Sequence, residues 1–175
     1  MKISRHVASR RAIAAIKKLL VVLACLLAPA LPSQAQERGN LFGDPFLPVT
    51  SGMPTCPLPL GPAVTQADVR EQAHVRAQHG GSCFRAGRCR LPNSYLYDAE
   101  IVPRVALAIR QDGRFDDTSI WVSGERRLVT LTGCVQSAHQ AQAVERLVLL
   151  IDDVMGVINL LMVGNQGPAP YEIKQ

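Results

Sequence analysis

The stretch from residue 97 to residue 163 constrains the fold most, because its apolar residues repeat with helical and strand periods. Residues 98–112 predict a helix that buries one apolar face and ends at Gly113. Pro103 fits this helix only in its first turn, where the missing N–H costs little. The apolar face of the helix consists of Ile101, Val105, Ala108 and Ile109.

Two strands, a second helix and a third strand follow. Residues 118–123 and 127–135 alternate apolar and polar side chains, with a turn at Gly124-Glu125-Arg126 between them. Residues 137–151 predict a helix that Ser137 caps, and residues 157–163 predict the last strand. The order α-β-β-α-β predicts an α+β sandwich with two helices on one face of a three-stranded sheet.

Several short motifs in this stretch have the order and spacing of a known family. They are Asp98-x2-Ile101, Val105-Ala106-Leu107, Ile120-x-Val122, Val129-Thr130-Leu131-Thr132-Gly133-x-Val135, Gln140, and Gly156-Val157 through Asn159-x-Leu161-x-Val163. Residues 97–163 therefore resemble the BON domain, which is named after a bacterial osmotic-stress protein and nodulation proteins. No single motif is specific, and the resemblance rests on all of them together.

The chain departs from the family pattern at three places. Pro103 interrupts the first helix, Asp152-Asp153 replaces small or apolar residues, and Cys134 is not a family residue. The resemblance implies a non-enzymatic envelope protein that binds phospholipid or envelope components. The alternative is a protein–protein interaction module that docks on an envelope or secretion-apparatus partner. Both implications rest on analogy at the level of the fold.

Strand alternation divides the side chains of the predicted sheet between two faces. The helices would cover Ile120, Val122, Val129, Leu131, Val135, Leu161 and Val163. The opposite face would hold Trp121, Leu128, Thr130, Thr132, Cys134, Ile158, Leu160 and Met162. The resemblance implies polar residues at positions 160 and 162, where this chain has Leu and Met. The predicted binding surface on this open face consists of Trp121, Leu128, Ile158, Leu160 and Met162.

Three kinds of cover for this open face are expected. Residues 40–96 of the same chain are the first, because a domain of this size gains stability from extra burial. A second copy of the chain, which would give a homodimer, is another. Direct contact with lipid or with a protein partner is the third.

The first 35 residues have the pattern of a secretory signal peptide. A basic segment ends at Lys17-Lys18, an apolar run covers residues 19–31, and Ser33-Gln34-Ala35 fits a cleavage site. The apolar run is too short to span a bilayer comfortably. We therefore expect a periplasmic protein with no transmembrane span after the signal.

Two variants of this signal stay open. Ser9-Arg10-Arg11-Ala12-Ile13 resembles a twin-arginine signal, whose substrates cross the membrane folded. Val22-Leu23-Ala24-Cys25 resembles a lipobox, which would leave Cys25 lipidated and make the protein a peripheral lipoprotein.

Four cysteines remain if Cys25 leaves with the signal: Cys56, Cys83, Cys89 and Cys134. An even number in an exported chain predicts two disulfides, and four cysteines allow three pairings. Because Cys134 lies on the open face, we expect a long-range bridge from it to one of the others, and a local bridge between the remaining two. A zinc site is the rival interpretation, but His74, His79, Cys83 and Cys89 have no standard zinc spacing.

The chain carries a net charge of +5, which comes from the signal segment. Its six basic residues leave 13 Lys and Arg against 14 Asp and Glu in the remaining chain, a net charge of −1. This balance gives no reason to expect nucleic-acid binding. Arg85, Arg88 and Arg90 nevertheless cluster near two cysteines, and guanidinium groups suit an anionic phospholipid head group.

No motif of the chain indicates catalysis. It has no Gly-x-Ser-x-Gly and no phosphate-binding glycine loop after a strand, and His139 is expected at a helix surface. We expect no enzyme, no cofactor and no metal. Residues 36–96 read as an irregular Pro/Gly/Arg-containing, Cys-bearing extension with one short helix over 65–79, and residues 164–175 as a flexible tail.

Overall fold

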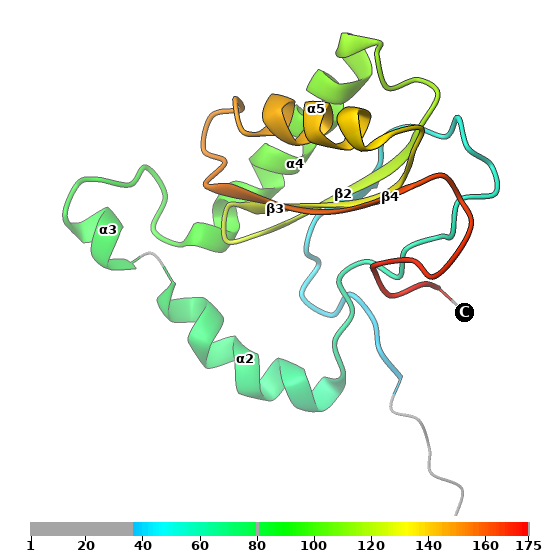
Figure 1. Cartoon of the computed structure of the whole chain (residues 1–175). Coiled ribbons are helices and arrows are strands. Elements are labelled where there is room, and N and C mark those ends of the chain that lie inside the picture. The colour runs from blue at the N-terminus through cyan, green and yellow to red at the C-terminus, as the bar shows by residue number, and fades with distance from the viewer. Residues whose placement is uncertain (1–36, 80, 175) are drawn as a thin grey trace, which may run out of the picture. The chain divides into compact units, whose positions relative to one another are not determined.

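In the computed structural model, which describes residues 37–79 and 81–174, the periodic stretch folds into a sheet with two helices on one face (Figure 1). The element order agrees with the prediction, and the bounds differ by a few residues. The elements are α4 (Asp98–Asp112), β2 (Ser119–Glu125), β3 (Leu128–Val135), α5 (Ala138–Val148) and β4 (Gly156–Val163). The predicted signal segment and Cys25 lie outside the described residues.

The predicted three-stranded sheet is wrong, because Phe46–Pro48 adds a fourth strand, β1. The strand order is β1-β2-β3-β4. β1 and β3 both pair antiparallel with β2, whereas β4 pairs parallel with β3. Leu47 pairs with Val122 and packs against the core. Three residues that end in a proline are too short for an alternating pattern to be visible in the sequence.

The core lies between the sheet and the two helices. Ala108, predicted on the apolar face of α4, is only half-buried and lies outside this core. The fully buried side chains include the other three residues of that face and most of the predicted inner face of the sheet: Ile101, Val105, Ile109, Ile120, Val122, Val129, Leu131 and Val135. Val163 is an exception, because it ends an edge strand and stays 54% exposed.

Pro103 lies in the second turn of α4 and not in the first, since the helix begins at Asp98. Its ring is on the exposed side of the helix, and so is Ala99, whose carbonyl loses its usual partner. That carbonyl can therefore be solvated, which explains why the proline is tolerated. The second helix is shorter than predicted, because α5 ends at Val148 and not near Ile151.

The turn between β2 and β3 begins two residues later than predicted. Arg126 and Arg127 form it, with φ angles of 54° and 69°. Gly124 belongs to β2, where a Cβ atom would lie 2.8 Å from Cγ2 of Val102 in α4. This glycine therefore serves the close approach of helix and strand, and not the turn.

Asp98 holds this turn in place. Its buried carboxylate accepts hydrogen bonds from the backbone N–H groups of Arg126, at 2.8 Å, and Arg127, at 2.7 Å. Burial raises the pKa of Asp98, with a contribution from the nearby carboxylates of Asp44 and Glu125, although the two N–H groups act in the opposite direction.

We expect Asp98 to make the stability of the fold depend on pH. Its raised pKa means that the folded state binds the proton more tightly than the unfolded state. The contribution of Asp98 to the free energy of unfolding is therefore full below the ordinary carboxyl pKa and falls as pH rises through the raised pKa. Urea unfolding of the wild type and of Asp98→Asn, between roughly pH 4 and pH 7, checks this. The wild type should lose stability relative to the variant as pH rises, and a constant difference would contradict the assignment.

The extension contains the predicted short helix, α2 (Gln66–Gln78). Thr65 and Asp68 form a capping box at its start. No residue of α2 is buried, but Arg76 ties it to the rest of the chain. The guanidinium group of Arg76 makes two hydrogen bonds of 2.7 Å to Asp44 and stacks on the ring of Phe42. A second helix, α3 (Gly81–Arg85), and a 3-10 turn, η1 (Ser94–Tyr97), occupy part of the region predicted as a loop.

The tail predicted to be flexible is held against the extension. Ile173 forms a β-bridge with Pro59, and the N–H groups of Leu60 and Lys174 complete the pairing through the carbonyls of Glu172 and Leu58. Figure 1 shows the tail folding back beneath the sheet, on the side away from α4 and α5. The sequence of the tail has no period that could indicate this partner.

Candidate functional site

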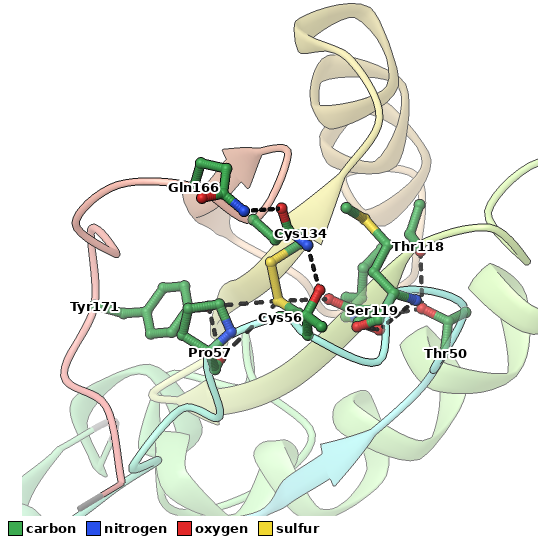
Figure 2. The surroundings of a disulfide bond; sticks show 12 residues. Thr50, Cys56, Pro57, Thr118, Ser119, Cys134, Gln166 and Tyr171 are labelled. Carbon is green, nitrogen blue, oxygen red and sulfur yellow. Dashed lines mark hydrogen bonds between the residues drawn. A yellow bond between two sulfur atoms is a disulfide. The ribbon is translucent and has the colours of Figure 1, made fainter.

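Two disulfides join the four cysteines, and their pairing follows the predicted pattern. Cys56 is bonded to Cys134 across 78 residues, and Cys83 is bonded to Cys89 across six. The long-range bridge attaches the extension to the open face of the sheet (Figure 2). The local bridge uses both cysteines of the rival zinc interpretation, so they are not metal ligands here.

The chain itself covers the open face around the long-range disulfide. Cys134 and Met162 are buried there, and Met53, Trp121 and Ala169 pack against them. Figure 2 shows the hydrogen bonds that seal this region. The hydroxyl of Thr50 bonds that of Thr118, Ser119 bonds the backbone of Met53, and the Tyr171 hydroxyl donates to the carbonyl of Pro57.

The covered region removes part of the predicted binding surface. Met162 is buried and Trp121 is half-buried, so neither offers a free apolar face. Leu128 is also half-buried, beside Gly156. Ile158 is 46% exposed on the edge strand β4. The extension and the tail are therefore the cover for this part of the open face.

Leu160 lies in a pocket of about 260 Å³ that remains on the open face. Thr130 and Thr132 of β3 line it, together with residues of the extension and of the tail. Its lining also includes three acidic residues, Asp44, Glu125 and Glu172. This concentration of carboxylates makes the pocket unsuited to an anionic head group.

The three arginines predicted to bind head groups have different roles in the structure. Arg85 and Arg88 are exposed. Arg90 instead binds Glu100 at 2.7 Å and reaches Asp153 at 3.4 Å. The Arg90 guanidinium group lowers the pKa of Glu100, which in turn raises that of Arg90.

Asp153 joins three separate parts of the chain. Its carboxylate lies 3.3 Å from the guanidinium group of Arg127, 3.2 Å from that of Arg104 and 3.4 Å from that of Arg90. Arg127 also donates to the Asp153 carbonyl at 2.8 Å. Residues 83–90, which we call the disulfide loop, therefore meet α4, the β2–β3 turn and the segment after α5 at one end of the domain.

The segment after α5, residues 149–155, exposes large apolar side chains at this end. Leu150 is 81% exposed and Met155 is 69% exposed, and Leu149 is exposed beside them. Ile151 and Val154 point the other way and pack against the core. The segment is thus anchored from within while its other side chains face solvent. We refer to it as the apolar loop.

The apolar loop was missed by the sequence prediction, which placed residues up to Ile151 in a buried helix. The sequence did contain a signal for this exposure, because the run Leu147–Ile151 is apolar at all five positions. Five consecutive helical residues cannot all lie on the one face that a surface helix buries. A helix that ends at Val148 leaves Leu149 and Leu150 without a core to face.

The apolar loop and its arginines suit a surface that is apolar and negatively charged. Glu100, Asp153 and the exposed Asp152 balance the three arginines that meet there, so the excess positive charge at this end comes from Arg85 and Arg88 on the adjoining disulfide loop. Exposed leucine and methionine beside arginine are typical of segments that lie in the interface of a membrane. Within residues 37–79 and 81–174, no helix is long and apolar enough to cross a bilayer.

Comparison with known proteins identifies the periodic stretch. Residues 97–165 match the family model described as the BON domain, as the motifs and their spacing predicted. No curated protein matches the chain.

Proposed function

We propose, on the premise that residues 97–165 form a BON domain, that the protein is a non-enzymatic module of the bacterial envelope that docks on anionic phospholipid. BON domains in general occur in envelope proteins and are associated with phospholipid binding. Two disulfides support a site of action in an oxidising compartment such as the periplasm.

The exposure of Leu150 and Met155 carries the proposal. Both side chains project from a loop whose inner residues pack against the core. This packing holds the loop in place while Leu150 and Met155 stay exposed to solvent. An apolar side chain that leaves water for the acyl region gains about 1.5–3 kcal/mol. Two such side chains supply a reversible anchor and not a permanent one.

The arginines supply the part of the interaction that depends on lipid charge. Each basic residue near an anionic surface contributes about 1 kcal/mol, and salt screens this contribution. Arg85 and Arg88 are the residues to vary, because Arg90 also holds the disulfide loop on Glu100 and Asp153. Removing Arg90 would therefore change the structure as well as the charge.

Flotation with phosphatidylglycerol-containing vesicles and with neutral phosphatidylcholine vesicles tests the proposal. Leu150→Asp should weaken binding to the anionic vesicles by more than about tenfold, because a charge replaces an inserting side chain. Leu107→Asp is the matched control, since Leu107 is 50% exposed on α4 and belongs to no part of the apolar loop.

The same assay separates the effect of position from the effect of charge. Arg85→Ala/Arg88→Ala should bind anionic vesicles several-fold more weakly than Arg70→Ala/Arg110→Ala, which removes the same charge from exposed positions on α2 and α4. Equal binding of both double variants would refute the role of the disulfide loop. If Leu150→Asp also bound like the wild type, the alternative of docking on an envelope protein would replace the proposal.

A further inference from the structure

The outer edge of β4 is a second surface, which the lipid proposal does not use. The sheet order places β4 at one edge and β1 at the other. We propose that two copies of the chain pair antiparallel through β4, so that the two sheets become continuous across a two-fold axis.

The backbone of β4 shows which of its groups face this edge. Gly164 donates its N–H to Val135 of β3, while the N–H of Leu161 bonds the side chain of Asn159 in its own strand. Since backbone direction alternates along a strand, the even-numbered positions face β3 and the odd-numbered positions face outward. Val157, Asn159, Leu161 and Val163 therefore direct their N–H and C=O groups to the free edge.

The two edges of the sheet differ in how well they are protected. Edge strands commonly avoid pairing by being short or by carrying proline or charge. β1 has three residues, ends in Pro48 and follows Pro45. β4 has eight residues, GVINLLMV, with no proline and no charge. Within residues 37–79 and 81–174, β4 is therefore the edge that is suited to pairing, and pairing of that edge gives a closed dimer and not a fibre.

The sequence of β4 is complementary to itself when the two-fold axis passes through Leu160. In this register Val157 faces Val163 of the other copy, and Asn159 faces Leu161. On the open face, Ile158 lies beside Met162 and the two Leu160 side chains meet. Every outward N–H then has a carbonyl partner. The exposed Val163, 54% accessible, gains Val157 as an apolar neighbour. Ile158, 46% accessible, lies across from the strand position of Met162, whose side chain Met53 and Ala169 of its own chain already cover.

This complementarity is the reason for choosing a second copy as the occupant. An unrelated strand would need its own matching apolar pattern, whereas β4 already contains one. Pairing does break one contact, because Leu161 must release the side-chain oxygen of Asn159. Asn159 keeps its hydrogen bonds to the Ala141 carbonyl and to Glu145, so its side chain stays in place.

Sedimentation velocity of the full-length protein, without lipid and over a range of micromolar concentrations, tests this inference. We expect a reversible dimer. Ile158→Lys should raise its dissociation constant by at least about tenfold, as a lysine on an edge strand opposes pairing. Leu107→Lys, at a similarly exposed apolar position on α4, should leave it unchanged. A monomer at all concentrations, or a dimer that both variants leave unchanged, would overturn the inference.

A cysteine at position 160 tests the register. In the proposed register, Leu160 of one copy lies directly opposite Leu160 of the other. The two residues form a non-hydrogen-bonded pair, in which the Cα atoms approach to about 4.5 Å. Leu160→Cys should therefore form a covalent dimer under mild oxidation, while Ile158→Cys, which would face Met162, should cross-link several-fold more slowly. Equal cross-linking of the two variants, or capture of a heterologous strand in place of a second copy, would contradict the pairing.

Discussion

Cys56→Ser/Cys134→Ser is expected to lose about 4.5 kcal/mol of unfolding free energy, because the bridge closes a loop of 78 residues in the unfolded chain. The Cys83–Cys89 bridge closes a loop of only six residues, so Cys83→Ser/Cys89→Ser should lose about 2 kcal/mol of unfolding free energy. Urea unfolding of both double variants and the wild type measures the two values. The order of the two losses is the decisive result.

The same experiment has a second readout at the open face. Without the long-range bridge, the extension is no longer tied covalently over Met162 and Trp121. The emission of Trp121, the only tryptophan, should shift to the red in Cys56→Ser/Cys134→Ser and stay unchanged in Cys83→Ser/Cys89→Ser. Equal losses of stability with unchanged emission would mean that packing, and not the bridge, keeps the extension in place.

Gly133→Ala is expected to have an effect of similar or greater size. Gly133 has a φ of 122°, and a Cβ atom there would lie 2.0 Å from the carbonyl oxygen of Ser119. It would also lie 3.2 Å from Cα of Ile120, which is paired with Gly133 across β2 and β3. Both neighbours are backbone in the middle of the sheet, so neither can move without breaking the pairing. We expect a loss of more than about 4 kcal/mol.

Gly156→Ala is the control for this prediction. A Cβ atom there would meet only the Cδ2 atom of the half-buried Leu128, at 3.2 Å, and the end of that side chain can move. The free energy of unfolding should change by less than about 1 kcal/mol. Thermal unfolding of the two variants compares them. A folded Gly133→Ala domain with the stability of Gly156→Ala would contradict the role of Gly133.

The fold could be predicted where burial imposes a period on the sequence. The bounds of α4 follow from its apolar face and from Gly113, and the start of α5 follows from the Ser137 cap. β1 could not be predicted, because Leu47 is its only residue that packs on the core. The turn was misplaced because Gly124 resembles a turn residue, whereas it serves the contact with α4.

The candidate site was less predictable than the fold. Alternation correctly assigned Trp121 and Met162 to the open face, but it could not show that the extension and the tail cover them. Leu150 was assigned to a helix, since apolar character does not distinguish a core residue from an exposed one. Arg90 is held by Glu100 at 2.7 Å and by Asp153 at 3.4 Å, and no local pattern connects it with Asp153, which lies 63 residues away.

A tryptophan in the apolar loop tests the central claim most directly. Leu150→Trp in a Trp121→Phe background places the only tryptophan on the most exposed apolar residue of the loop, while wild-type Trp121 reports on the covered face. The emission of the loop tryptophan should shift to the blue with phosphatidylglycerol vesicles and not with phosphatidylcholine vesicles. Trp121 in the wild type should not respond to either. A loop tryptophan that keeps its emission in both vesicles would contradict docking on anionic lipid through this loop.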